Sequence, residues 1–244
     1  AHGGSELQLP DQSMLLKALS SLARPAPQRW PCSPIFPTND ACCISAASCR
    51  LAGGVQGVMP SWHAATSAHD AVSSVPPSRW DAGDAMDKRA FYGAFLRRVD
   101  LFDRGAFGLP PAEADLMDPH QRIALEEGYA TLHAASLNRS SLMGSVTGVF
   151  AGLWPSDYTA VLAKRGAAAA GPFAVAATGL AMLVGRFSYV LGLQGPSVAF
   201  DTACSASLSA FQGALYAHRH RDCDACLVLG VNVMCDSGTS QLFA

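Results

Sequence analysis

The 244-residue chain has little charge, no excess of basic residues and no long hydrophobic run. Charged residues make up 15% of it, and 17 Lys and Arg stand against 19 Asp and Glu, for a net charge of −2. This balance argues against a basic nucleic-acid-binding protein. The longest apolar stretch, residues 180–193, is interrupted by Gly185, Arg186 and Gly192, so it falls short of the roughly 20 residues that a membrane-spanning helix needs. We therefore expect neither nucleic-acid binding nor a membrane span.

Several short enzyme motifs are also missing. No Gly-x-Ser-x-Gly sequence occurs, which argues against a serine hydrolase built on that turn. The glycine cluster at 53–57 lacks the lysine and the spacing of a phosphate-binding loop, so it predicts a turn. The first residues lack the basic-then-apolar order of a signal peptide, and the chain begins with Ala1. We expect an intracellular protein, cytoplasmic by default with the organelle undetermined, and a fragment of a longer chain.

Eight cysteines are present. Because the chain is large and carries no secretion signal, we expect free thiols rather than a disulfide framework. Cys223 and Cys226 form one Cys-x-x-Cys, but no second Cys or His pair with zinc-site spacing lies nearby. We therefore expect no metal site, and we expect Cys226 to point into the core as a small hydrophobic residue.

The chain divides at about residue 40. Prolines concentrate before that point, which predicts that residues 1–40 are a Pro-rich extension or linker with one short helix near Ser13–Leu22. Residues 41–244 have the composition of one folded domain. No internal repeat occurs, and the only low-complexity tract is Ala167–Ala170.

Within the domain, strand patterns alternate with helix patterns. Asp118 as N-cap, Pro119 at the first helical position and Gln121 in a capping-box position predict a helix over 119–135. Further helices are expected around an apolar stripe from Leu180 to Val190 and over about 204–220. Strands are expected at 145–151, 197–201 and 226–234. This order predicts an α/β domain with a layered sheet.

Cys204 is the strongest candidate for chemistry. It follows a short apolar strand and begins a helix, among the small residues 203–207. A helix N-terminus presents free N–H groups and a positive dipole end, which favour an anionic sulfur and could serve an oxyanion. Leu208, Phe211 and Leu215 are predicted to form the core-facing stripe of this helix. On the residues alone, the alternative that Cys204 is one more buried cysteine at the start of a core helix stays open.

No histidine is an obvious base for Cys204. His218 and His220 lie further along the same helix, about 20 Å away at 1.5 Å per residue. His120 and His133 are expected to be partly exposed helix residues. His2, His63 and His69 lie in loop-like sequence. A cysteine hydrolase, which needs a nearby base, is therefore disfavoured.

A series of motifs resembles the β-ketoacyl synthases, most closely the ketosynthase domains of modular-type polyketide synthases. Asp201-Thr-Ala-Cys204-Ser resembles the family's active-site cysteine motif. The other matching stretches, which occur in the family's order over about residues 41–244, are 75–81, 99–103, 117–122, 147–150, 185–197 and 230–232, with a weaker match at 44–54.

The resemblance implies the N-terminal half of a thiolase-like layered α/β fold that forms a homodimer, with the strand around 197–201 near the dimer interface. It implies that Cys204 is the nucleophile that takes an acyl group from the phosphopantetheine arm of an acyl carrier protein, with its own backbone N–H as an oxyanion donor. Decarboxylation of a malonyl thioester and a Claisen condensation follow. No cofactor is expected to bind directly. Asp118-Pro119, the pair Gly185-Arg186 (close packing and a buried ion pair) and Asp201 are expected to be structural.

Two departures from the family accompany this resemblance. Two catalytic histidines and a lysine of the family are expected beyond Ala244, so we predict that this chain alone does not catalyse condensation. The stretch 176–185 is about two residues shorter than in the family. The alternatives are a fatty-acid-type 3-oxoacyl synthase and a non-catalytic ketosynthase-like subunit for dimerisation or carrier docking. The acyl substrate and product are not determined by the sequence.

Overall fold

The computed structural model describes residues 42–81, 83, 87–166 and 173–242. The predicted extension 1–40, its helix near Ser13–Leu22 and the tract Ala167–Ala170 lie outside the described residues. None of the described helices is long and apolar enough to cross a membrane.

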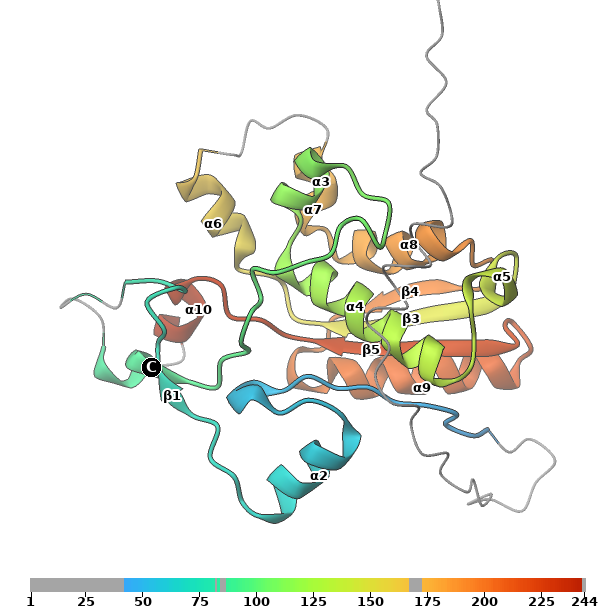
Figure 1. The fold of residues 1–244 in the computed structure, drawn as a ribbon, viewed down its shortest axis with the longest axis horizontal. Helices are drawn as coiled ribbons and strands as arrows, with labels where there is room; N and C mark the ends of the chain where they lie inside the picture. The colour runs from blue at the N-terminus through green and yellow to red at the C-terminus, as the bar shows by residue number, and fades with distance from the viewer. Residues whose placement is uncertain (1–41, 82, 84–86, 167–172, 243–244) are drawn as a thin grey trace, which may run out of the picture.

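Short elements precede the main sheet, and the longer helices pack around or beyond it (Figure 1). The helices are α2 (Val58–Thr66), α3 (Pro111–Leu116), α4 (Pro119–Ala134), α5 (Arg139–Leu142), α6 (Tyr158–Lys164), α7 (Phe173–Thr178), α8 (Leu180–Leu191), α9 (Ala206–Arg219) and α10 (Ser237–Leu242). The 3-10 turns are η1 (Ala52–Gly54), η2 (Lys88–Phe91) and η4 (Ala203–Ser205). The strands are β1 (Ser73–Ser74), β2 (Tyr92–Gly93), β3 (Thr147–Leu153), β4 (Ser197–Phe200) and β5 (Ala225–Val231).

The sheet at the centre is parallel, in the order β4-β3-β5. Val149 pairs with Ser197 on one side and with Leu227 on the other. Every residue of β3 is buried, as expected for the middle strand of a sheet covered on both faces. The predicted strands and their α/β order are confirmed.

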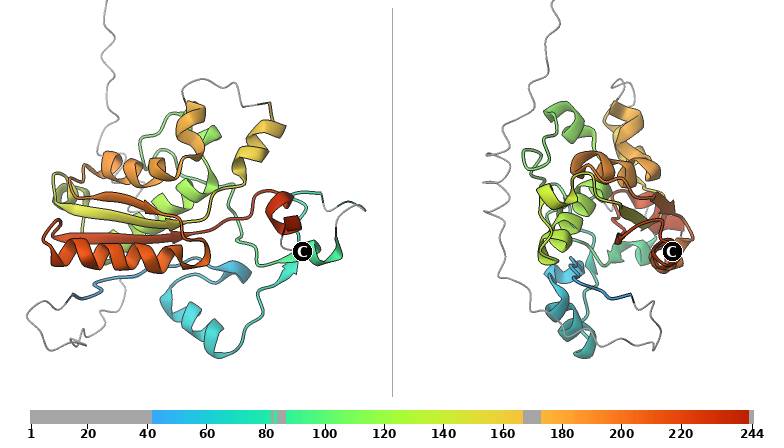
Figure 2. Two further views of the ribbon diagram at one scale, coloured as in Figure 1. Left: turned by 180° about the vertical axis from the view of Figure 1, so that it is seen from behind. Right: turned by 90° about the vertical axis from the view of Figure 1, so that its right-hand side faces the viewer.

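Helices cover both faces of this sheet (Figure 2). On one face, α4 and α8 bury the largest hydrophobic cluster, which includes Leu125, Val149 and Phe187. On the other face, α9 packs against Phe150. Parallel strands joined by helices that cover both faces form a layered α/β domain, and the carboxyl ends of its strands share one edge.

The predicted core stripe of α9 is wrong. Leu208 is 72% exposed, and Phe211 and Leu215 are only half-buried. The alanines of α9 face the sheet instead; they are Ala206, Ala210, Ala214 and Ala217. The reason is close approach: a Cβ on Gly152 of β3 would lie 2.3 Å from the carbonyl carbon of Ala206, so only small residues fit between helix and strand.

The start of α4 is confirmed, but its predicted capping box is wrong. Asp118 accepts a hydrogen bond from the backbone N–H of His120 at 2.8 Å, and Pro119 is the first helical residue. Gln121 does not reach back to the N-cap. Its amide nitrogen donates to the carbonyls of Ala176 and Ala177, at 3.1 and 3.0 Å, and so ties α4 to α7.

The pair Gly185-Arg186 meets only half of its prediction. Arg186 forms an ion pair with Glu113 and donates to Gln121 Oε1 at 3.0 Å, which confirms the expected ion pair. A Cβ on Gly185 would meet nothing within 4 Å, so no close packing occurs there. In the short stretch before it, Gly179 is extended, with ψ 132°, and separates α7 from α8.

The glycine cluster near the start of the described chain is a turn, as predicted. Gly53, Gly54 and Gly57 all have positive φ, between 73° and 95°. A backbone bridge joins Arg50 to Gln56 across this turn. Left-handed φ values favour glycine, which explains the cluster without a phosphate.

Candidate active site

Cys204 lies where β4 turns into α9, in the 3-10 turn η4. Its side chain is exposed, as are those of its neighbours from 201 to 205. Ala203, directly before it, has φ 54°, a left-handed conformation that is uncommon for a residue with a side chain. The backbone therefore turns sharply and leaves the thiol at the carboxyl edge of the sheet, at the amino end of α9.

Hydroxyl groups hold this turn together. The Ser205 hydroxyl donates to the Thr202 carbonyl at 2.8 Å and lies 3.0 Å from the Thr202 hydroxyl. Thr202 in turn lies 3.0 Å from the Ser209 hydroxyl, on the second turn of α9. Asp201 accepts a long hydrogen bond from the Ala203 N–H at 3.4 Å. These contacts support a structural role for Asp201 in shaping the turn.

Two glycines place the first turn of α9 directly on the sheet. Gly152 of β3 faces the backbone of Ala206, and a Cβ on Gly230 of β5 would lie 2.4 Å from the Ser207 hydroxyl. The start of α9 thus covers the ends of both strands. Cys204 precedes Ala206 in the chain and lies at the same edge.

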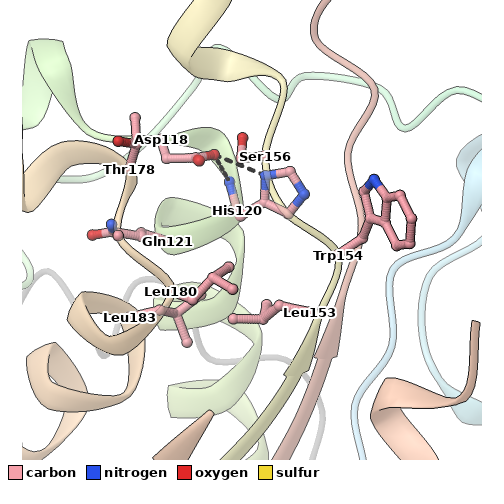
Figure 3. A pocket seen from close by; sticks show the side chains of 10 residues that line it. Asp118, His120, Gln121, Leu153, Trp154, Ser156, Thr178, Leu180 and Leu183 are labelled. Atoms are coloured by element: carbon pink, nitrogen blue, oxygen red, sulfur yellow. Dashed lines mark hydrogen bonds and ion pairs between the residues drawn. The ribbon is translucent and has the colours of Figure 1, made fainter. Parts of the chain in front are cut away.

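Sequence reasoning gave no role to two side chains that directly follow the carboxyl ends of β3 and β5. Trp154 and Asn232 each follow one of these glycines by two residues, and Trp154 is among the residues that line the pocket described next. Trp154, 37% exposed, points to the opposite side of its strand from Leu153 (Figure 3). Asn232 is exposed as well. Their only sequence signal is their place after a buried strand, and for Asn232 its membership of a family-like motif.

A pocket opens at the same edge of the sheet, between the starts of α4 and α8 (Figure 3). Its lining includes Asp118, Ser156 and Thr178 together with Leu153 and Leu183. Cys204 does not line it.

His120 is buried, which corrects the expectation of a partly exposed residue. The residue is 4% exposed, and its Nδ1 lies 2.8 Å from Asp118 Oδ1 (Figure 3). Its Nε2 accepts the Val233 N–H at 2.9 Å. Val233 belongs to the segment 232–236, which is more than a hundred residues from His120 in the chain. His63 is a second correction, since it lies in α2 rather than in a loop.

The remaining described histidines do not assist Cys204. His133 is exposed near the end of α4, and His218 and His220 lie at the end of α9. In the part of the chain that the structure describes, no hydrogen bond joins a histidine to the Cys204 thiol, so the structure supplies no base for a cysteine hydrolase.

Cys223 and Cys226 are packed in the core between α9 and the sheet. Cys226 packs with Cys223 against the α9 alanines, as predicted, with 3.3 Å between their sulfur atoms. Burial, with a smaller effect of the Cys223 contact, raises the pKa of Cys226 to about 12. Among the described residues no three His, Cys, Asp or Glu side chains gather as a metal site.

Comparison with known proteins identifies the family. The family model "Beta-ketoacyl synthase, N-terminal domain" matches residues 39–244. The chain belongs to the β-ketoacyl synthase family. The resemblance found in the sequence motifs is thereby confirmed, including the thiolase-like α/β fold.

Relatives of this β-ketoacyl synthase are polyketide synthases. A phenolphthiocerol synthesis polyketide synthase type I of Mycobacterium bovis is 40% identical over 195 residues, 76% of this chain and 9% of its own length. The spectinabilin polyketide synthase system protein NorC of Streptomyces orinoci is 37% identical over 239 residues, 94% of this chain and 10% of its own. The chain thus spans about a tenth of these relatives.

Solved ketosynthase domains share its fold. The oxazolomycin ketosynthase domain OzmH KS7 of Streptomyces albus matches with a TM-score of 0.71 and 31% identity, over 81% of this chain and 36% of that one. The ketosynthase from module 6 of the bacillaene synthase of Bacillus subtilis 168 matches with a TM-score of 0.70 and 31% identity, over 81% and 32%. The chain spans about a third of each.

Proposed function

We propose that the protein acts in polyketide synthesis as a ketosynthase, with Cys204 as the residue that accepts the acyl group. The observation that carries the proposal is the position of this thiol: exposed, on a sharp turn, at the carboxyl edge of a parallel sheet and the amino end of a helix. Polyketide synthases among the relatives favour this function over a fatty-acid-type synthase, and the retained cysteine favours it over a docking subunit.

The first half-reaction is a thioester exchange. The Cys204 sulfur attacks the carbonyl carbon of an acyl thioester, the bond to the donor's sulfur breaks, and the donor leaves as a free thiol that takes up one proton. The backbone N–H of Cys204 is the proposed donor to the oxyanion of the tetrahedral intermediate. A nucleophile fixed on a rigid turn suits this step, because dividing the reaction into transfer and condensation lowers each barrier.

The second half-reaction requires a malonyl-type thioester. Loss of carbon dioxide leaves a carbanion that attacks the acyl carbon on Cys204, forms the new carbon–carbon bond and returns the thiol. The proposed partner for both steps is an acyl carrier protein, which delivers each thioester on a phosphopantetheine arm. No other cofactor is proposed.

The proposed assembly is a cytoplasmic homodimer. Its support is the edge strand β4 of the described sheet, where Ser197 and Val198 are exposed. Light scattering of the purified chain measures the mass directly, and a monomer at micromolar concentration would contradict a dimer made by this chain.

Acyl transfer is tested with the 244-residue chain and an acetyl thioester of N-acetylcysteamine. Mass spectrometry is expected to find one acetyl group on the peptide that contains Cys204, and Cys204→Ala is expected to lose it. Cys42→Ala is the matched control, because Cys42 is another exposed cysteine. Equal acetylation of the wild type and the Cys204→Ala protein would refute the proposed role.

A further inference from the structure

Side chains from three distant parts of the chain hold the segment 232–236 that follows β5. His120 of α4 accepts the Val233 N–H at 2.9 Å. Arg79 donates to the backbone carbonyl of Met234 at 3.0 Å. The Asp157 carboxylate accepts hydrogen bonds from the backbone N–H groups of Cys235 and Asp236, at 2.9 to 3.1 Å. So many contacts to one short segment fix its path where it leaves the sheet.

The contact with His120 also fixes the state of that ring. A backbone N–H can only donate, so Nε2 of His120 carries a lone pair and Nδ1 carries the proton. That proton is directed at Asp118 Oδ1, 2.8 Å away (Figure 3). Both side chains are almost fully buried. The Asp118–His120 pair is therefore a fixed acceptor for the loop.

Asn232 begins this segment, and its direction follows from its neighbours. Val231 and Val233 both pack into the cluster around Ile123, on the α4 side of the sheet. Asn232 lies between them and so points to the opposite side, where α9 begins. Ser207, in the first turn of α9, lies against Gly230, and Cys204 is in the turn that directly precedes this helix.

We propose that Asn232 binds the thioester substrate beside Cys204, and that His120 is its positioning residue. The inference rests on the proposed function. An asparagine side chain both donates and accepts hydrogen bonds, and it is exposed here. The arm of a carrier thioester holds an amide close to its sulfur. Asn232 recognises this amide while Cys204 attacks the carbonyl carbon.

The test compares two acetyl donors: the thioester of N-acetylcysteamine, whose arm has an amide, and S-butyl thioacetate, whose arm has none. Rates of Cys204 acetylation are measured by mass spectrometry at subsaturating concentrations. Asn232→Ala is expected to slow the amide-bearing donor about fivefold, the size of one hydrogen bond, and to leave the butyl donor unchanged. The different reactivity of the two leaving thiols cancels when the variants are compared.

Variants of His120 separate positioning from mere stability. His120→Leu removes the acceptor for Val233 and is expected to lose the same preference for the amide-bearing donor, with no further loss in the double variant with Asn232→Ala. His120→Gln keeps an acceptor and is expected to retain the preference. In the wild type, nitrogen NMR is expected to show the proton of the His120 ring on Nδ1.

The possible failures are distinguishable. Equal slowing of both donors in Asn232→Ala would overturn the role of Asn232. Additive losses in the double variant would overturn the role of His120. Neither result would contradict acyl transfer to Cys204. If neither donor acetylates Cys204, the proposed function is overturned, and this inference with it. If His120→Leu does not fold, Asn232→Ala, a change at an exposed residue, still decides the substrate contact.

Discussion

At the scale of single residues, the described cysteines differ in burial, and Cys49 is intermediate between the two groups that follow. Cys42, Cys43 and Cys204 are exposed. Cys223 and Cys235 are buried, and Cys226 is half-buried beside Cys223. Burial raises the pKa of Cys235, with the nearby Asp157 carboxylate acting in the same direction. The thiolate is the reactive form, so location should decide reactivity.

Alkylation with iodoacetamide at pH 8 is expected to show this division. In the folded protein Cys42, Cys43 and Cys204 should react first, and Cys223, Cys226 and Cys235 at least about tenfold more slowly, because packing limits access to their sulfur atoms. In urea all should react at similar rates. Peptide mass spectrometry over time measures each site. Fast native labelling of Cys235 would show that its surroundings open readily.

Glu126 has a partly buried carboxylate that forms an ion pair with Arg50. Its carboxylate lies 3.4 Å from Arg50 Nη1. Burial nevertheless raises the pKa of Glu126 by more than Arg50 lowers it. The folded state then binds the proton more tightly than the unfolded state does, so stability is lost as the pH rises from the unfolded pKa through the folded one.

Replacement Glu126→Gln is therefore expected to stabilise the protein at pH 7. The gain should shrink as the pH falls toward 4, where the unfolded carboxyl is also protonated. Urea unfolding of both proteins at several pH values gives the difference in the free energy of unfolding. A gain that grows toward low pH would have the wrong sign for this explanation.

At the scale of elements, the contact between α9 and the sheet sets the place of Cys204. Gly152→Ala puts a methyl group 2.3 Å from backbone, which cannot rotate away. We expect a loss of about 1–3 kcal/mol in the free energy of unfolding and slower acylation of Cys204, since α9 must shift. Urea unfolding and the acetylation assay measure the two effects.

Gly185→Ala is the matched control. Gly185 lies inside helix α8, is exposed, and a Cβ there meets nothing within 4 Å. An alanine in a helix interior is expected to stabilise by about 0.5–1 kcal/mol. If both substitutions had the same effect, close packing at Gly152 would not be the cause.

At the scale of the whole molecule, the chain spans about a third of the solved ketosynthases, 32% and 36% of the two compared. In the described residues the one fully buried histidine, His120, is committed to Asp118 and Val233. The family's decarboxylation step relies on two histidines and a lysine, which the resemblance places after Ala244.

We therefore expect the 244-residue chain to accept an acyl group on Cys204 but to form no carbon–carbon bond. Incubation of the acetylated chain with a malonyl thioester is expected to release neither carbon dioxide nor a condensed product above the level of the Cys204→Ala protein. Release of carbon dioxide that depends on Cys204 would show that residues within this chain perform the decarboxylation.

The sequence by itself determined the order of strands and helices, the start of α4 at Asp118 and the place of Cys204 between β4 and α9. These features depend on local periodicity and capping, which act over a few residues. The tertiary structure decided that alanines, not Leu208, face the sheet, because Gly152 brings the backbones together. It also decided that His120 is buried and accepts a hydrogen bond from the Val233 N–H. Contacts between residues far apart in the chain arise from packing, and local patterns do not encode them.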